Sequence, residues 1–165
     1  MVSQTSLAHP TAHPYLLPVP CATTFGMAAV SDLALLLRAM EPALHDGVYV
    51  YATVPADHDL AGLPVIAMVR EPEGVTVVVA EADAERARLP VVFRAAWISL
   101  TVHSDLQAVG LTAAFATALG DAGISCNVVA GVYHDHLFVP VERAADALGV
   151  LLDLQQTARS RPEPG

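Results

Sequence analysis

Residues 96–141 constrain the fold most, because their hydrophobic pattern changes from the period of a strand to that of a helix and back again. Apolar and polar side chains alternate over residues 97–103, which is typical of a strand with one face on a core. Over residues 110–122 the apolar side chains recur at the i, i+3, i+4 spacing of an amphipathic helix. Gly123 follows where a left-handed C-terminal cap is expected.

Two strands and a second helix come next, in the order of a known α+β fold. Residues 124–130 and 134–141 each have the pattern of a strand, and residues 131–133 can form the hairpin between them. Residues 142–154 carry apolar side chains at helical spacing. The order strand, helix, strand, strand, helix is most of the ferredoxin-like βαββαβ fold, an antiparallel sheet with helices on one face.

The N-terminal half repeats this order less completely. The expected elements are a helix over residues 31–40 capped by Ser31 or Asp32, strands over 47–54, 64–70 and 75–80, a helix over 81–89 and an extended piece over 91–93. The connection over residues 55–64 is too short and too rich in proline for the first helix of the fold. We therefore expect two units in tandem, a degenerate one over residues 29–93 and a better copy over 94–155. Residues 1–28, which are rich in proline, and 156–165 are expected to be disordered tails.

Four segments of the C-terminal half resemble the ACT domain family: Leu100-Thr101-Val102, Gly110-Leu111-Thr112, Ala122-Gly123-Ile124-Ser125 and His134-Asp135-His136-Leu137-Phe138-Val139. The Ala-Gly-Ile-Ser corner, followed by a hairpin and an apolar strand, is the most recognisable of them. Residues 30–155 as a whole resemble small bacterial proteins built from two ACT-like units in tandem. The resemblance implies a ferredoxin-like fold in each unit and a small-molecule ligand, without naming that ligand.

The same resemblance implies a ligand site in the loop after the first strand of the C-terminal unit. Unpaired backbone N–H groups at the start of the following helix attract carboxylates and other anions. In the family, amino acids bind at this loop together with the start of the second strand of a neighbouring domain. Carried over by motif, the candidate residues are Ser104, Asp105, Gly110, Leu111, Ser125, Cys126 and Asn127. The alternative is that Ser104 or Asp105 caps the helix and that Asn127 pairs with a turn.

Three histidines suggest a second kind of site. If the strand of residues 97–103 pairs antiparallel with that of residues 134–141, then His103, His134 and His136 share the face away from the helices. Such a patch can bind Zn²⁺ or another borderline metal, or it can respond to pH. A His-x-His spacing alone is a weak motif, so solvent-facing or contact residues are the simpler interpretation.

Composition and charge disfavour several classes of function. The chain is 54% hydrophobic and has a net charge of −9, which argues against binding to nucleic acids and to anionic membranes. No apolar run approaches the roughly 20 residues that span a bilayer. All eight basic residues are arginine, so no lysine can form a Schiff base or serve a phosphate-binding loop. Two cysteines, Cys21 and Cys126, with no secretory signal, lead us to expect a reducing cytoplasm.

No familiar catalytic motif accompanies these features. We therefore expect a non-catalytic regulatory or sensor protein that needs no cofactor and binds a small molecule, with an amino acid as the expected ligand. A homodimer is also expected, because the helix-free face of the sheet carries Trp97 and Phe138 and such a face tends to meet another layer. The alternatives are a metal- or small-ligand-binding protein that uses the three histidines, and a structural interaction module.

Overall fold

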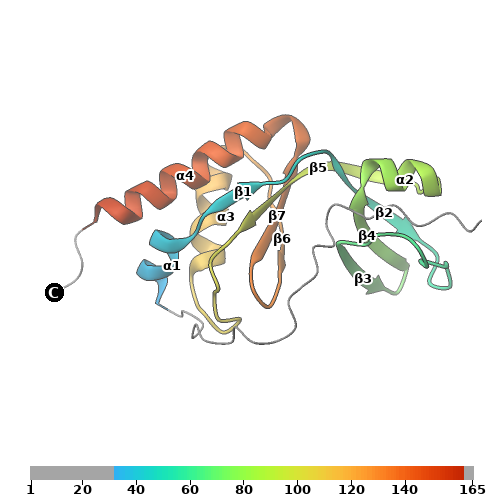
Figure 1. Cartoon of the computed structure of the whole chain (residues 1–165), viewed down its shortest axis with the longest axis horizontal. Coiled ribbons are helices and arrows are strands. Elements are labelled where there is room, and N and C mark those ends of the chain that lie inside the picture. The colour runs from blue at the N-terminus through green and yellow to red at the C-terminus, as the bar shows by residue number, and fades with distance from the viewer. Residues whose placement is uncertain (1–31, 162–165) are drawn as a thin grey trace, which may run out of the picture.

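The computed structural model describes residues 32–161, which form an antiparallel sheet with helices on one of its faces (Figure 1). The expected N-terminal tail, Cys21 and Ser31 lie outside the described residues. The strands are β1 (Pro42–Leu44), β2 (Tyr49–Val54), β3 (Ala67–Glu71), β4 (Gly74–Ala80), β5 (Val91–Leu100), β6 (Asn127–Ala130) and β7 (Asp135–Pro140). The helices are α1 (Leu33–Ala39), α2 (Glu81–Ala87), α3 (Leu111–Asp121) and α4 (Ala144–Ser160), with a 3-10 turn, η1 (Val141–Arg143), ahead of α4. Within residues 32–161, no helix is both long enough and apolar enough to cross a membrane.

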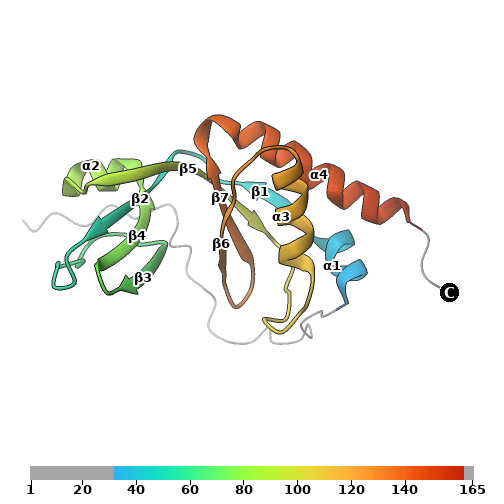
Figure 2. The ribbon, with the colours of Figure 1, turned by 180° about the vertical axis from the view of Figure 1, so that it is seen from behind.

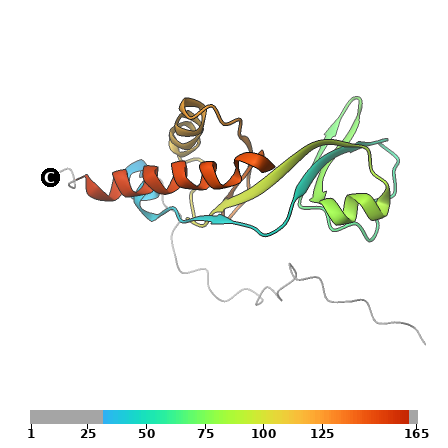
Figure 3. The ribbon, with the colours of Figure 1, turned by 90° about the horizontal axis from the view of Figure 1, so that it is seen from above.

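One long strand, β5, joins the two units of the sheet. The strand order in the described residues is β3-β4-β2-β5-β7-β6, and the short β1 lies beside β5. The first half of β5 pairs with β2, and its second half pairs with β1 and β7, so the strand runs through both halves of the molecule (Figure 3). The extended piece and the strand predicted over residues 91–93 and 97–103 are therefore one element. It ends at Leu100, and the N–H of Ser104 then bonds to the carbonyl of Val102 in a turn, which leaves His103 outside the sheet.

Three helices cover one face of the C-terminal unit (Figure 2). α3 and α4 pack there as the ferredoxin-like fold requires, and α1 packs against both of them. The order of the sequence suggests that α1 belongs to the N-terminal unit, whereas Leu36 and Met40 are fully buried in the core of the C-terminal unit. α1 was expected in the unit of residues 29–93, but its apolar stripe packs against α4, near the C-terminal end of the described residues.

Contacts with α1 also explain why α4 is longer than the sequence predicts. The periodicity ends this helix near residue 154, but α4 continues to Ser160, into the expected tail of residues 156–165. Arg159 Nε donates to the carbonyl of Arg38 at 2.9 Å, and the buried Gln155 donates to the carbonyl of Met40. These bonds satisfy carbonyl groups at the end of α1 and hold the last turns of α4 in place.

The N-terminal unit is smaller, and α2 is the one helix of the described residues that packs on it. α2 covers its core, which consists mainly of valine and alanine side chains from β2 and β4. Between β2 and β3 the structure has a loop, in which Leu60, Leu63 and Val65 pack against this core. Asp59 shapes the loop by accepting a hydrogen bond from the N–H of Ala61 at 2.8 Å. The loop thus takes the place of the helix that its proline-rich sequence disfavours.

Aromatic side chains gather on the helix-free face of the sheet, where the two units meet. Tyr49 and Phe138 are buried there although no helix covers them. The rings of Tyr51 and Phe138 stand edge to face with their centroids 5.6 Å apart, which connects β2 of one unit to β7 of the other. These aromatic side chains of one sheet therefore pack against one another across the junction of the two units.

Candidate ligand-binding site

The loop between β5 and α3 leaves the start of α3 without a side-chain cap. Gly110 is the N-cap residue, with a φ angle of +106°, and no side chain in the described residues caps the first turn. Asp105 instead accepts a hydrogen bond from the N–H of Gln107 at 2.8 Å and so shapes the loop itself. The alternative prediction that Ser104 or Asp105 caps the helix is therefore wrong. The first N–H groups of α3 are placed to meet an anion.

A buried carboxylate, that of Asp135, faces this loop from the start of β7. Asp135 is only 7% exposed, and Ser104 Oγ donates to its Oδ2 at 3.4 Å. Burial raises the pKa of Asp135, while the hydrogen bond from Ser104 and the neighbouring His136 and His134 act in the opposite direction. A buried carboxylate with one long hydrogen bond is stabilised by a cationic partner, so this position suits an ammonium group.

Sequence reasoning gave Asp135 no role in the site, although the pattern contained a signal. Asp135 shares one strand face with Leu137 and Val139, so a carboxylate stands at a core position of β7. In the sheet it lies opposite Leu100, at the end of β5 where the loop begins. Aspartate is rarely buried unless it has a partner, so its place on an apolar strand face marks it for attention.

Asp135 and the loop enclose a cavity of about 60 Å³. Its walls include Ser104, Asp105, Leu111, Thr112, Ala130 and Asp135. Gly110 is not one of them, and its role is steric, since a Cβ atom there would lie 2.8 Å from Leu33 Cδ2 in α1. Pockets that enclose a small-molecule ligand measure about 300–1,000 Å³, so the loop of one chain forms only part of such a site.

The remaining predicted site residues lie at the opposite end of β6. Asn127 is the first residue of this strand and Ser125 and Cys126 come just before it, whereas Ala130 at its end is paired with Asp135 beside the loop. The structure therefore keeps the two halves of the predicted site apart within one chain. Burial raises the pKa of the Cys126 thiol to about 11, so the thiol stays protonated and unreactive near neutral pH.

The three histidines of the alternative site do not surround a common point. In residues 32–161, no group of three or more His, Cys, Asp or Glu side chains is arranged to hold a metal ion. His103 lies in the loop after β5, and the Nδ1 of His134 is buried without a hydrogen bond to any described residue. His136 projects to the helix-free face, where its ring contacts Trp97 and Ser99.

A small polar network around Ser99 accounts for the position of His136. Ser99 Oγ lies 2.9 Å from His136 Nδ1 and 2.8 Å from His45 Nε2, and Trp97 Nε1 donates to the same Nδ1 at 3.2 Å. Burial lowers the pKa of both His45 and His136. Sequence reasoning missed His45, because its place becomes apparent only once β1 is known to pair with β5.

Comparison with known proteins covers nearly the whole described chain. Two ACT domain family models match in tandem, one over residues 28–96 and the other over residues 92–153. A search of curated proteins finds no match. Domains of this family typically bind small-molecule ligands in a regulatory role and often dimerise.

Solved structures show the same arrangement. A Vibrio cholerae protein of unknown function, called a possible transport protein, is 50% identical and covers 75% of this chain and 96% of its own, with a TM-score of 0.68. A protein from Agrobacterium tumefaciens is 16% identical over 70% of this chain and 89% of its own, with a TM-score of 0.57. The ligand-free regulatory subunit of aspartate kinase from Thermus thermophilus is 15% identical over 70% of this chain and 97% of its own, also with a TM-score of 0.57. The last two comparisons show likeness of fold, and the tandem family matches together with the Vibrio relative show that this chain belongs to the ACT domain family.

Proposed function

We propose that this protein is a non-catalytic regulatory protein that binds an amino acid in a site formed between two copies of the chain. One observation carries the proposal: the buried carboxylate of Asp135 and the uncapped start of α3 face the same small cavity. An amino acid carries the two complementary charges. Its ammonium group binds Asp135 and Ser104, and its carboxylate meets the N–H groups of Leu111 and Thr112.

A second copy of the chain would complete this site through the edge of the sheet. β6 is the last strand in the order, and its outer edge has no partner strand in the described residues. Such an edge presents unpaired N–H and C=O groups to another chain. When two copies pair antiparallel through β6, the start of one strand lies beside the end of the other. Ser125, Cys126 and Asn127 of one copy then close over the β5–α3 loop of its neighbour.

Three further observations support a binding role without catalysis. Ser99, the hydroxyl that touches two imidazoles, is only 4% exposed and lies on the other face of the sheet from the loop. The Cys126 thiol stays neutral, because burial raises its pKa to about 11. The Thermus thermophilus relative is itself a regulatory subunit. An amino acid as the ligand is our inference from the paired charges.

The test is binding of the common amino acids, first by thermal shift and then by calorimetry. A ligand that binds only the folded state raises the melting temperature. For the amino acid found, Asp135→Asn should weaken binding by about tenfold or more, since a hydrogen bond to a charged group contributes about 1.5–3 kcal/mol. Asp121→Asn is the matched control, because it removes the same charge from the exposed last residue of α3, away from the cavity. Equal losses in the two variants, or full binding by Asp135→Asn, would contradict the proposal.

A further inference from the structure

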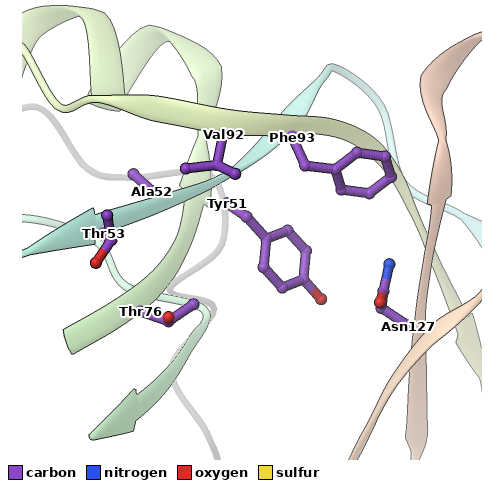
Figure 4. Close-up of a pocket in the computed structure, with 7 residues that line it drawn as sticks. All are labelled: Tyr51, Ala52, Thr53, Thr76, Val92, Phe93 and Asn127. Atoms are coloured by element: carbon purple, nitrogen blue, oxygen red, sulfur yellow. The ribbon is translucent and has the colours of Figure 1, made fainter. Parts of the chain in front are cut away.

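A larger cavity lies on the helix-free face of the sheet, between the two units. Its volume is about 400 Å³, within the range of about 300–1,000 Å³ that is usual for small-molecule pockets. Figure 4 shows the ring of Tyr51 projecting across the gap toward Asn127, with Phe93 beside it. This cavity is distinct from the one beside the β5–α3 loop, because the two share no lining residue, although Asn127 is also among the residues proposed to close over the loop of a neighbouring copy.

The surface of this cavity is mostly apolar, and two of its polar side chains, those of Tyr51 and Asn127, face each other across the gap (Figure 4). The rings of Tyr51 and Phe93 lie 5.9 Å apart at an angle of 58° and form an aromatic wall. Burial raises the pKa of Tyr51 to about 12, so its hydroxyl stays protonated and can donate a hydrogen bond. Asn127 Nδ2 donates to the carbonyl of Phe138 at 3.5 Å, which leaves its Oδ1 as an acceptor.

The charge around the cavity restricts what can bind there. None of the described residues that line it carries a charge. The carboxylate bonded to its wall is that of Glu71, which accepts from Thr76 Oγ1 at 2.5 Å. Since an ion entering an apolar site without a partner loses its hydration, a neutral occupant is favoured and an anion is disfavoured further by Glu71.

We infer that this cavity binds an uncharged, flat aromatic molecule of about the size of naphthalene that carries one polar group. The ring system of this molecule lies against Tyr51 and Phe93, and its polar group meets the Tyr51 hydroxyl and the Asn127 amide. Tyr51 belongs to β2 of the N-terminal unit and Asn127 to β6 of the C-terminal unit. An occupant therefore contacts both units and stabilises their arrangement.

A matched pair of fluorescent probes tests the chemistry of this cavity. Phenylnaphthylamine is neutral, and anilinonaphthalene sulfonate has the same ring system with an added negative charge. We expect saturable binding of phenylnaphthylamine at one site per chain, and binding of the sulfonate that is weaker by about tenfold or more. The absence of saturable phenylnaphthylamine binding, or equal affinity for both probes, would overturn the inference.

Variants test the location of the bound probe. Thr53 is an exposed lining residue, so the indole of Thr53→Trp fills the cavity and should weaken phenylnaphthylamine binding by about tenfold or more. Met68→Trp, on the exposed surface of β3 outside the cavity, is the control and should bind as the unchanged protein does. If Thr53→Trp does not fold, Val92→Trp blocks the cavity from another wall residue, which is 73% exposed. Unchanged phenylnaphthylamine binding in the blocked variant would overturn the inference. Displacement of the probe as the protein concentration rises would also overturn it, because a second copy of the chain would then occupy the cavity.

Discussion

The imidazole of His45 lies flat on the indole of Trp97, with ring centroids 3.7 Å apart and planes within 10° of each other. The backbone N–H of His45 also donates to the backbone carbonyl of Trp97 at 2.9 Å. Because Trp97 Nε1 can only donate, the Nδ1 of His136 that accepts its bond carries no proton. Ser99 then donates to His136 and accepts from His45, so the hydrogen bonds of this network run in a single direction.

We predict that the protein loses stability as the pH falls below about 6.5, the ordinary pKa of histidine. Burial lowers the pKa of His45 and His136 in the folded state, and both regain the ordinary value on unfolding. Between the lowered pKa and the ordinary one, the unfolded chain binds more protons, so the free energy of unfolding decreases as the pH falls through that window and is constant above it. Urea unfolding at about pH 7.5 and about pH 5.5 measures the difference.

Asp135 has the opposite effect on the pH dependence of stability, because its raised pKa favours the folded state as the pH falls through the titration of this carboxyl. Histidine variants separate the two effects. His136→Gln should reduce the pH dependence of the free energy of unfolding near pH 6, because one of the two groups with a lowered pKa is gone. His58→Gln, in the exposed loop between β2 and β3, should leave the dependence unchanged. An identical pH dependence in His136→Gln and the unchanged protein would contradict this explanation.

Removal of the Ser99 hydroxyl should destabilise the fold by about 1–3 kcal/mol, the usual cost of leaving a buried polar group unsatisfied. In Ser99→Ala the Nε2–H of His45 loses its acceptor, and Ser99 is only 4% exposed, so water does not easily replace it. Ser125→Ala is the control, because Ser125 is exposed and its loss should change stability by less than about 0.5 kcal/mol. Trp97, the single tryptophan, provides a fluorescence signal for the unfolding curves.

A side chain at Gly110 should destabilise the protein by about 1–3 kcal/mol, the range for a non-glycine residue in such a backbone region. The φ angle is +106°, and a Cβ atom would lie 2.8 Å from Leu33 Cδ2. Gly120→Ala is the matched control within α3, because its Cβ would meet nothing within 4 Å. That control should stabilise the helix by about 0.5–1 kcal/mol. Chemical denaturation measures the free energy of unfolding of Gly110→Ala and of Gly120→Ala. Equal stability of these two variants would contradict the steric role of Gly110.

Asp135→Asn should leave the free energy of unfolding at neutral pH unchanged or higher while it weakens ligand binding. Burial raises the pKa of this carboxyl, which means that the folded state disfavours its ionised form. The amide has the same shape and no charge, so folding no longer buries an ion. Urea unfolding of Asp135→Asn beside Asp121→Asn measures this, and a large loss of stability confined to Asp135→Asn would indicate a structural role instead.

Local patterns predicted the elements of the fold better than the partners of those elements. The alternation of Ile98, Leu100 and Val102 correctly assigned the helix-facing side of β5, because strand geometry depends on neighbouring residues alone. The same reasoning placed α1 in the N-terminal unit by its order in the sequence, whereas α1 packs against α4, which lies more than a hundred positions away. It also extended β5 to His103, because nothing local marks the turn after Leu100.

The sequence predicted only those parts of the candidate site that lie within one continuous segment of the chain. The β5–α3 loop and Gly110 were expected from the change of period and the family resemblance, and the structure has Gly110 as the N-cap residue of α3. The apolar strand face of Asp135 was a signal in the sequence, but its position beside the loop, like the position of His45 beside Ser99, follows from strand pairing, which spacing in the sequence does not reveal. The start of β6 lies away from the loop in one chain, so its part in the site remains a prediction about two chains.

Sedimentation velocity measures whether the amino-acid site is shared between two copies of the chain. The full chain is measured over a series of concentrations, with and without the amino acid that the thermal-shift screen identifies. A ligand held by both copies binds the dimer more tightly than the monomer, so by linkage it must shift the equilibrium toward the dimer. A shared site predicts that saturating amino acid lowers the dissociation constant of the dimer by about tenfold or more. A monomer that carries one tightly bound amino acid, with no shift toward the dimer, would contradict it.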